Sequence, residues 1–461
     1  MEVAVKQHDV KLSSRIAYGY FGLGSNFIGG LLGSFLTLYL TDNLLLSSGF
    51  IAGMMLICRF TNGVGELLVG LLIDKTHTRW GKARPWIIAG SFLCALPVWL
   101  IFTTPTNLEE TGRQIWIAVM YFLHTSVFGA MVSVADQALI VRMSKQSYTR
   151  TSMLILNTLL GQVGGMITGS WGIPMLLYFG GYETGYKWMS LIFCIGGFLG
   201  MLGTGMLCKE LPDDDLEEFK DRVKSKNTKD NVWYQYKCIF ENRYMACALA
   251  MYILAFFTTM LMGSSAVYFA RDVLNNAEFM AQITLATGIP AIIIMLIGIV
   301  PKIVSKFGIR IALLITTSLN VIGMVVMALN PSSATFIFIG KIICGIAGAI
   351  YVPIIGTVVA DIADLVNLKY DFDAAGKVTS ICSAGMKIGM GLGSVGVVVA
   401  LNLGGYSAKL ANNGMSQTAS ALFAEKACFI YIPLICFILI TLLATTMNIE
   451  EKLAKLRDNK V

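Results

Sequence analysis

Long apolar runs, separated by short polar breaks, are the feature that most constrains how this chain can fold. A bilayer core about 30 Å thick requires roughly 20 predominantly apolar residues in each spanning helix. Twelve runs of this kind occur in the 461-residue sequence. We therefore expect an all-α membrane protein of twelve transmembrane helices, at 17–41, 46–72, 85–104, 114–141, 151–179, 187–208, 244–269, 279–302, 308–329, 334–362, 373–402 and 424–447.

The composition agrees with this prediction. Hydrophobic residues make up 56% of the chain and charged residues 14%, against about 25% charged in an average soluble chain. Such a chain cannot cover itself with polar surface. Most of the ten cysteines lie inside the apolar runs, so we expect them to be reduced residues of helix packing. The N-terminal segment is too polar to be the core of a cleaved signal peptide.

A single long hydrophilic segment, 209–243, separates six apolar runs from six more. This arrangement is typical of transporters built from two parallel repeats that rock around a site at the membrane midplane. We expect an N-terminal six-helix bundle over 1–208, a cytoplasmic linker over 209–243, a C-terminal six-helix bundle over 244–447 and a cytoplasmic tail over 448–461. Together they predict the major facilitator fold.

Lysine and arginine set the expected orientation in the membrane. They gather before the first span, after the second, fourth and eighth spans, and in the C-terminal tail, while the loops between are poorer in cations. All of the cation-rich segments fall on one side if the spans number twelve. Both termini are therefore predicted to be cytoplasmic, in a multi-pass cell-membrane protein.

Several classes of function are disfavoured by the sequence. No basic patch with interleaved aromatics suggests nucleic-acid binding, and no phosphate-cradling loop suggests an ATP-driven pump. No Cys and His spacing suggests a metal site, and no nucleophile with a paired base suggests an enzyme. We expect no cofactor.

Placing an ionisable side chain at bilayer depth costs free energy, so each such residue requires a structural or functional explanation. On the second helix, Arg59, Asn62 and Glu66 are spaced by three and four residues, which places them on one helical face. A carboxylate there can take up a proton or help to coordinate a cation. We favour a coupling role for Glu66; a buried structural pair of Arg59 with Glu66 is the alternative.

Other ionisable positions are open to two interpretations. Asp136, six residues before Arg142, either reaches water or lines the transport cavity. Lys387, within the eleventh span, either extends to the interface or meets an anionic partner. Asp361 and Asp364, at the end of the tenth helix, fit a gate or a loop anchor better than a substrate site.

Three sequence motifs resemble the glycoside, pentoside and hexuronide cation symporters of the major facilitator superfamily, the group that includes melibiose permease. YGYFGLGSNF with LYLTD (18–27, 38–42) is similar to the family's first helix, and DKTHTRWGKARPW (74–86) to its second-to-third loop. ADIADLVN (360–367), followed by Lys387, is similar to the family's tenth-helix end and eleventh-helix lysine. The resemblance implies gating roles for four charged residues of these motifs: Asp74, Arg84, Asp361 and Asp364.

For the coupling site, the resemblance implies an RxxDxxxD-like pattern on the second helix. Arg59 matches it, Asn62 replaces the first carboxylate and Glu66 occupies the second. One carboxylate with neutral ligands is a poorer sodium cage, because a hard cation needs several oxygen ligands with enough negative charge. Between the two coupling ions, we therefore favour the proton over sodium.

For the substrate site, the resemblance places Asn26 where the family has a galactoside-binding aspartate. Ser133 takes the acidic position of the fourth helix, one turn before Asp136, and Val352, next to Tyr351, takes the position of a sugar-stacking aromatic. These departures, with Lys387 kept, favour an acidic glycoside such as a uronide over a neutral galactoside. The side chains expected to line the substrate site are Asn26, Ser133, Asp136, Tyr351 and Lys387.

The sequence therefore predicts a cation-coupled symporter of a small sugar or glycoside, working by alternating access in the lipid bilayer. A lipid or lysolipid transporter on the same fold is the main alternative, because the sugar site is weakened. A sensor that binds its ligand without transporting it is a further one.

Overall fold

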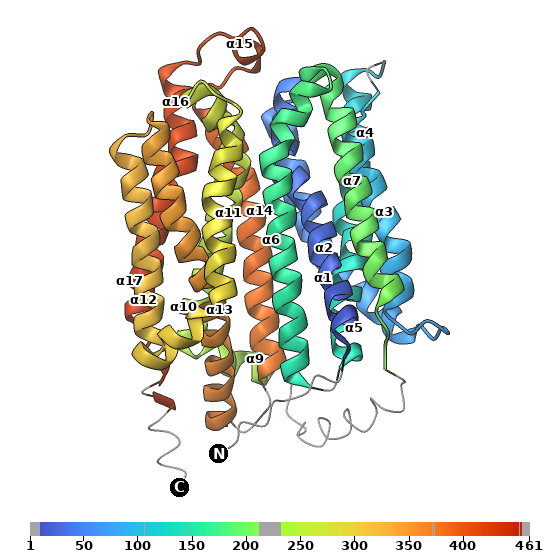
Figure 1. Ribbon diagram of the computed structural model, residues 1–461, viewed down its shortest axis with the longest axis vertical. Coiled ribbons are helices and arrows are strands. Elements are labelled where there is room, and N and C mark those ends of the chain that lie inside the picture. Colours follow the sequence, from blue (N-terminus) through green and yellow to red (C-terminus); the bar gives the residue numbers. More distant parts are fainter. Residues whose placement is uncertain are drawn as a thin grey trace. The chain divides into compact units, whose positions relative to one another are not determined.

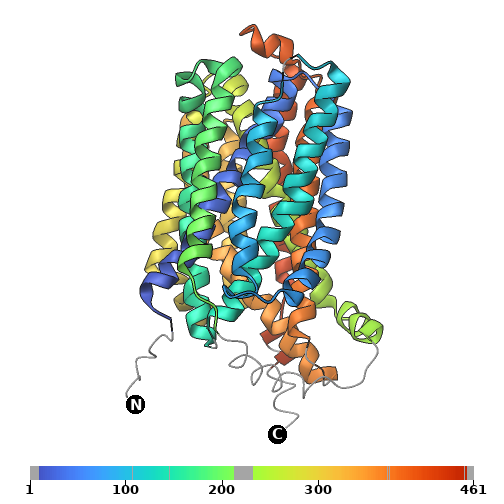
Figure 2. The ribbon, with the colours of Figure 1, turned by 90° about the vertical axis from the view of Figure 1, so that its right-hand side faces the viewer.

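The computed structural model describes residues 10–105, 107–144, 146–211, 232–370, 372, 374–450 and 452–453. Their contacts divide the chain into two compact units, Met1–Arg222 and Val223–Val461. The described residues contain helices and loops but no strand (Figures 1 and 2). The prediction of an all-α protein is confirmed.

The described residues of the first unit form ten helical elements, some of which follow one another without a break. In chain order they are α1 (Leu12–Leu31), η1 (Leu32–Leu36), η2 (Tyr39–Asn43), α2 (Ser48–Lys75), α3 (Arg84–Phe102), α4 (Glu110–Phe122), η3 (Leu123–Gly129), α5 (Ala130–Met143), α6 (Ser147–Tyr178) and α7 (Gly181–Leu207). The η elements are π-helical segments inside or at the end of longer helices.

The second unit repeats this plan and adds two short helices. Its elements are α9 (Val232–Phe240), α10 (Arg243–Tyr268), η4 (Phe269–Val273), α11 (Phe279–Ile297), α12 (Ile299–Leu329), α13 (Ala334–Tyr370), α14 (Ala375–Leu403), α15 (Ala408–Asn412), α16 (Ala419–Lys426), η5 (Ala427–Tyr431) and α17 (Ile432–Thr445). Helix α9 lies at one end of this unit and contacts α10 and α13 (Figure 2).

Each of the twelve predicted spans coincides with a helix or with consecutive helical segments. By length and composition, ten helices in the described part of the chain can cross a membrane. The other two predicted spans are α1 with its continuation to Asn43, and α6, both of which contain many Gly, Ser, Thr and Asn residues. Small and weakly polar residues lower the hydropathy of a helix but allow close packing.

Helix α1 shows what those small residues do. It packs against α6 and α7 at distances that leave no room for a methyl group. A Cβ added to Gly24 would lie 2.6 Å from the carbonyl oxygen of Gly197 on α7, and one added to Gly164 on α6 would lie 2.6 Å from the carbonyl oxygen of Leu23. The glycines of the first span therefore bring helix backbones into direct contact.

The π-helical segments η2 and η4 end the first long helix of each unit in the same way. Leu44 N–H donates to the carbonyl of Tyr39 at 3.0 Å, and Leu274 N–H donates to that of Phe269 at 3.2 Å. The next residue in each unit has a positive φ, 54° at Leu45 and 52° at Asn275. The same turn chemistry closes the first helix of both units.

Most of the predicted linker, residues 212–231, and positions 451 and 454–461 of the predicted tail lie outside the described residues. The predicted gap between 302 and 308 is helical, because α11 ends at the left-handed Gly298 and α12 starts directly after it. Within α12, Gly308 has a non-helical backbone with φ 78°, which marks the real break between two helical stretches.

Candidate functional site

Arg59, Asn62 and Glu66 all lie on α2, which is helical without a break over their positions. Their spacing of three and four residues therefore puts them on one face, as expected. All three side chains are half-buried. The structure thus places the predicted coupling residues together in the first unit.

The π-helical segment η3 holds this face of α2. A π-helix shifts the backbone hydrogen-bond pattern and presents carbonyl groups to neighbouring side chains, often at functional sites. The side-chain amide of Asn62 donates to the carbonyl of Thr125 at 2.6 Å. Directly beside this bond, the hydroxyls of Thr61 and Ser126 lie 2.7 Å apart, and that of Ser126 also donates to the carbonyl of Cys58 at 3.1 Å.

Gly65 allows this close approach. A Cβ at Gly65 would overlap the carbonyl oxygen of Ser126, so the backbone of α2 touches η3 immediately before Glu66. This contact holds the backbone of α2 against η3 directly before Glu66.

Arg59 lies close to Tyr121 of α4, and its guanidinium group interacts with the Tyr121 hydroxyl. The Nε atom of Arg59 is buried and has no hydrogen-bond partner in the described part of the chain. Nearby on η3, the Nδ1 atom of His124 lies 2.9 Å from the carbonyl of Cys94, so His124 is a hydrogen-bonded core residue.

A second carboxylate, Asp136 on α5, lies against α1. The hydroxyl of Tyr18, which is fully buried, interacts with the Asp136 carboxyl group. The Oδ1 atom of Asp136 is buried and has no hydrogen-bond partner among the described residues. Ser133, one turn earlier, is half-buried, whereas Asn26 on α1 is exposed in the structure and donates to the carbonyl of Gly22 at 2.9 Å.

In the second unit, the predicted substrate residues have different environments. Tyr351 on α13 is 6% exposed and belongs to the apolar core, and its hydroxyl has no hydrogen-bond partner among the described residues. Its neighbour Val352 is 57% exposed. Lys387 on α14 and Asp361 are half-buried, while Asp364 is exposed. The substrate roles of Tyr351 and Lys387 and the gating roles of Asp361 and Asp364 stay predictions.

Sequence reasoning overlooked Lys341, a charged residue in the apolar run of α13. Its side chain is 7% exposed, and its ammonium group lies 4.3 Å from the ring centroid of Phe429 on η5. Phe429 in turn stacks on Phe269 of η4 at 4.4 Å. The signal was present in the sequence as a lone lysine about two turns into a predicted span.

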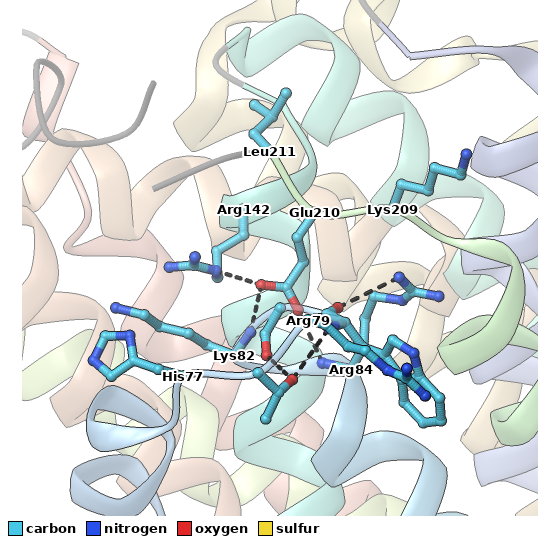
Figure 3. Close-up of a pocket in the computed structure, with 11 residues that line it drawn as sticks. His77, Arg79, Lys82, Arg84, Arg142, Lys209, Glu210 and Leu211 are labelled. Atoms are coloured by element: carbon cyan, nitrogen blue, oxygen red, sulfur yellow. Dashed lines mark hydrogen bonds and ion pairs between the residues drawn. The ribbon is translucent and has the colours of Figure 1, made fainter. Parts of the chain in front are cut away.

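A charge cluster around Glu210 was also overlooked, because this residue was assigned to the linker. Its carboxylate accepts hydrogen bonds of 2.9 Å from the backbone N–H groups of Lys82, Ala83 and Arg84. It also accepts one of 2.5 Å from Nε of Arg142, and the side chains of Arg142 and Glu210 are only 13% and 3% exposed (Figure 3). Glu210 thereby caps the N-terminus of α3, where backbone N–H groups lack partners and negative charge is favoured.

Arg84, one of the predicted gating residues, completes this arrangement, which we call the first clasp. Its Nε donates to the carbonyl of Gly205 at 2.8 Å and an Nη to that of Met206 at 3.0 Å. Arg84 therefore ties the start of α3 to the end of α7, and Glu210 ties the chain after α7 back to α3. The side chain of Asp74, the other predicted gate in this loop, lies outside the described residues.

The second unit contains the same device in a simpler form, the second clasp. The carboxylate of Glu450, just after α17, accepts from the N–H of Ile309 at 3.0 Å. Arg310 donates to the carbonyl of Thr445 at the end of α17, at 2.7 Å. In both units the glycine before the segment whose N–H groups donate has a positive φ, 104° at Gly81 and 78° at Gly308.

These features agree with the comparison to known proteins. The sequence model of the MFS/sugar transport protein family matches residues 17–451, nearly the whole chain. The chain belongs to this family. The predicted resemblance to cation symporters of the major facilitator superfamily is confirmed, and the family consists of membrane transporters rather than enzymes. The chain is accordingly a multi-pass membrane protein.

Two curated relatives are distant in sequence but match nearly the whole chain. The chain is similar to the isoprimeverose transporter of Lactiplantibacillus pentosus, with 23% identity over 440 residues that cover 94% of this chain and 88% of the relative. It is also similar to the inner membrane symporter YicJ of Escherichia coli strain K12, with 23% identity and coverage of 99% and 97%. Among solved structures, a D-xylose-proton symporter aligns with a TM-score of 0.61 and 13% identity, covering 92% of this chain and 96% of that one. This last likeness concerns the fold.

Proposed function

We propose that this chain transports a sugar or glycoside together with a cation, by alternating access of its two six-helix halves. The names of its relatives, an isoprimeverose transporter and a symporter, support this proposal. The observation that carries it is the polar face of α2, where Glu66 lies beside the hydrogen-bonded contact with η3. A ligand drives such a cycle only through its different affinity for the two facing states.

The coupling ion in this proposal is the proton, carried by Glu66. The predicted coupling face offers one carboxylate, since Asn62 stands in place of a second. The amide of Asn62 already donates to Thr125, and Arg59 interacts with Tyr121. A single carboxylate beside neutral groups can bind and release a proton, whereas a hard cation such as sodium needs several charged or carbonyl oxygens.

The substrate in this proposal carries a negative charge, as a uronide does. Lys387 supplies a cation on α14, and Asn26 replaces a carboxylate that would repel an acidic sugar. Ser133, Asp136 and Tyr351 are the further side chains assigned to the substrate. The hydroxyl of Tyr351 and the Oδ1 atom of Asp136 have no hydrogen-bond partner among the described residues, and a polar ligand would supply one.

The topology in this proposal has both termini in the cytoplasm, with halves at 1–208 and 244–447 joined by the linker 209–243. Asp74, Arg84, Asp361 and Asp364 then act at the cytoplasmic gate. Epitope tags at either terminus should be accessible to antibodies only after the cell membrane is permeabilised. Tags accessible on intact cells would contradict this orientation.

Proton coupling is tested in proteoliposomes without a membrane potential and at low sodium. Neutral and acidic glycosides are added one at a time, and the compound that is transported should raise the pH of the external medium. We expect the acidic glycosides to give the signal. Uptake that requires sodium and leaves the pH unchanged would contradict proton coupling.

The role of Glu66 is tested with Glu66→Gln, and Glu109→Gln is the matched control because Glu109 is exposed in a predicted external loop. We expect Glu66→Gln to abolish accumulation against a gradient while exchange of labelled for unlabelled substrate persists. Accumulation at the wild-type level would rule out Glu66 as the proton carrier. Competition by lysolipids but not by sugars would instead favour a lipid transporter on this fold.

A further inference from the structure

Helix α10 carries an aromatic stripe to which the proposed function has so far given no role. Tyr252, Phe256, Thr259 and Gly263 follow one another at intervals of four, three and four residues, so they share one face of the helix. Tyr252 and Phe256 are half-buried, and Thr259 is exposed. A Cβ added to Gly263 would meet no atom within 4 Å. The described residues of the second unit therefore cover this face of α10 only in part.

The neighbouring face of α10 is packed tightly against α14. A Cβ at Gly389 of α14 would overlap the carbonyl oxygen of Ile253, and one at Gly393 would overlap that of Phe257. These two residues of α10 directly follow the two aromatic residues of the stripe. Because successive residues of a helix are separated by about 100° around its axis, α14 covers one side of α10 and leaves the stripe beside it.

The two rings of the stripe lie next to each other. The ring centroids of Tyr252 and Phe256 are 6.0 Å apart, and the ring planes are inclined by 22°. Two nearly parallel rings, one helical turn apart, offer adjoining aromatic surface on the same face of the helix. We call this pair, Tyr252 and Phe256, the aromatic shelf.

The aromatic shelf lies near the middle of its membrane span. At about 1.5 Å of rise per residue, Tyr252 and Phe256 lie about 14 Å and about 20 Å from the start of α10, in a bilayer core about 30 Å thick. The Tyr252 hydroxyl forms no hydrogen bond with another described residue. A hydroxyl group that faced lipid chains at this depth would lose its hydrogen bonds to water without replacement. The stripe is therefore better suited to a polar ligand than to lipid.

Two further hydroxyl groups accompany the aromatic shelf. The hydroxyl of Thr259 donates to the carbonyl of Ala255 at 2.8 Å, and its oxygen can still accept a hydrogen bond. The hydroxyl of Tyr351 on α13 lies near that of Tyr252. Aromatic rings beside hydroxyl groups match a sugar ring, which has C–H groups of partial positive charge on its faces and hydroxyls around its edge. An aliphatic chain would match the rings but not the hydroxyls.

We propose that the sugar ring of the substrate stacks against the aromatic shelf and that the Tyr252 hydroxyl binds one of its hydroxyls. This inference rests on the proposed function and deepens it, because it assigns recognition of the ring to α10 and leaves recognition of the negative charge to Lys387. Stacking engages the C–H groups of the ring and not its carboxylate. The aromatic shelf therefore contributes equally to the binding of neutral and acidic glycosides.

The test measures ligand binding to the purified full-length chain in nanodiscs by equilibrium dialysis. The probes are the radiolabelled methyl glycosides of glucose, galactose, xylose, glucuronic acid and galacturonic acid. The glycoside that the wild type binds most tightly is then used for the variants, and an unchanged melting temperature verifies that each variant is folded.

Tyr252→Leu and Phe256→Leu should each weaken binding about tenfold, because the aromatic contact with the sugar ring is lost. Tyr252→Phe keeps the ring and removes one hydrogen bond, so it should weaken binding about threefold. Phe256→Tyr should retain binding. Phe338→Leu on α13 is the matched control, since Phe338 is 38% exposed but lies outside the stripe, and it should bind as the wild type does.

The charge of the probe separates stacking from a general disturbance of the site. Tyr252→Leu should weaken the binding of a glycoside and of its uronide by the same factor, whereas Lys387→Met should weaken the binding of the uronide more. A loss confined to the uronide in Tyr252→Leu would contradict stacking.

If the folded variants Tyr252→Leu and Phe256→Leu bind the glycoside as the wild type does, the aromatic shelf is not part of the substrate site, while the proposed function stands. If the wild type binds none of the glycosides, the proposed function fails and this inference fails with it.

Discussion

The Nε atom of Arg142 donates a 2.5 Å hydrogen bond to the carboxylate of Glu210, joining the end of α5 to the segment that follows α7. A second bond, from the N–H of Leu211 to the carbonyl of Arg142 at 2.8 Å, runs in the opposite direction. Together they connect the fourth and sixth spans of the first unit at the same end. The charge pair is nearly buried, so its loss should be measurable.

Glu210→Gln should lower the free energy of unfolding by about 1–3 kcal/mol, because an ionised acceptor of four N–H donors becomes a neutral amide. The measurement is the melting temperature of the purified protein in detergent. Glu241→Gln is the matched control, since Glu241 is 55% exposed and its ion pair with Lys237 spans 4.0 Å. Equal melting temperatures for the two variants would mean that the first clasp contributes nothing to stability.

Glu450→Gln should have a smaller effect than Glu210→Gln. The residue is exposed, and its recorded acceptor role is a single bond from the N–H of Ile309. We expect a loss of less than about 1 kcal/mol. The same melting experiment ranks the two clasps, and a larger loss at Glu450 would show that burial does not set their relative strength.

Gly65→Ala should destabilise the contact between α2 and η3, because the added methyl group would overlap the carbonyl oxygen of Ser126. Overpacking of this kind costs about 1–3 kcal/mol. Gly63→Ala, on the same helix, is the control, since no atom lies within 4 Å of the added group. Uptake should fall with Gly65→Ala and remain with Gly63→Ala. Equal melting temperatures for the two variants would show that the backbone contact at Gly65 does not contribute to stability.

Lys341→Met should raise the melting temperature. The buried ammonium loses hydration that its single aromatic contact with Phe429 only partly replaces, and methionine fills a similar volume, so we expect a gain of about 1 kcal/mol or more. Lys302→Met, at an exposed position, should leave stability unchanged. A strong destabilisation by Lys341→Met would indicate that the cation is held by more than the ring.

Phe429→Leu should be destabilising by about 2–3 kcal/mol, because it removes both the contact with Lys341 and the stacking on Phe269. Combining it with Lys341→Met gives a double-mutant cycle that isolates the ammonium–ring interaction. If the stability changes of the two single variants add up to that of the double variant, the ammonium–ring interaction contributes no net free energy.

Much of the fold could be predicted because a membrane imposes length and polarity on each span. The twelve apolar runs could be found without knowing which helices pack together, because the thickness of the bilayer sets the number of residues in each span. The shared face of Arg59, Asn62 and Glu66 could be predicted for a similar reason, because helical periodicity fixes it locally. The family could be recognised from motifs that are continuous in the sequence, above all the loop at 74–86.

Contacts between segments far apart in the sequence could not be predicted by these local rules. The interaction of Arg59 on α2 with the hydroxyl of Tyr121 on another span was not predicted, because nothing in the sequence relates the two positions. Glu210 was assigned to a linker because its neighbours in sequence are charged, although its carboxylate is buried against a loop 126–128 residues earlier. The sequence by itself determined where the membrane-spanning segments lie and how polar they are, because the free energy of transferring each side chain from water to lipid depends on that residue alone. Only the tertiary structure decided which side chains meet, because hydrogen bonds act over about 3 Å between atoms whose separation along the chain carries no such constraint.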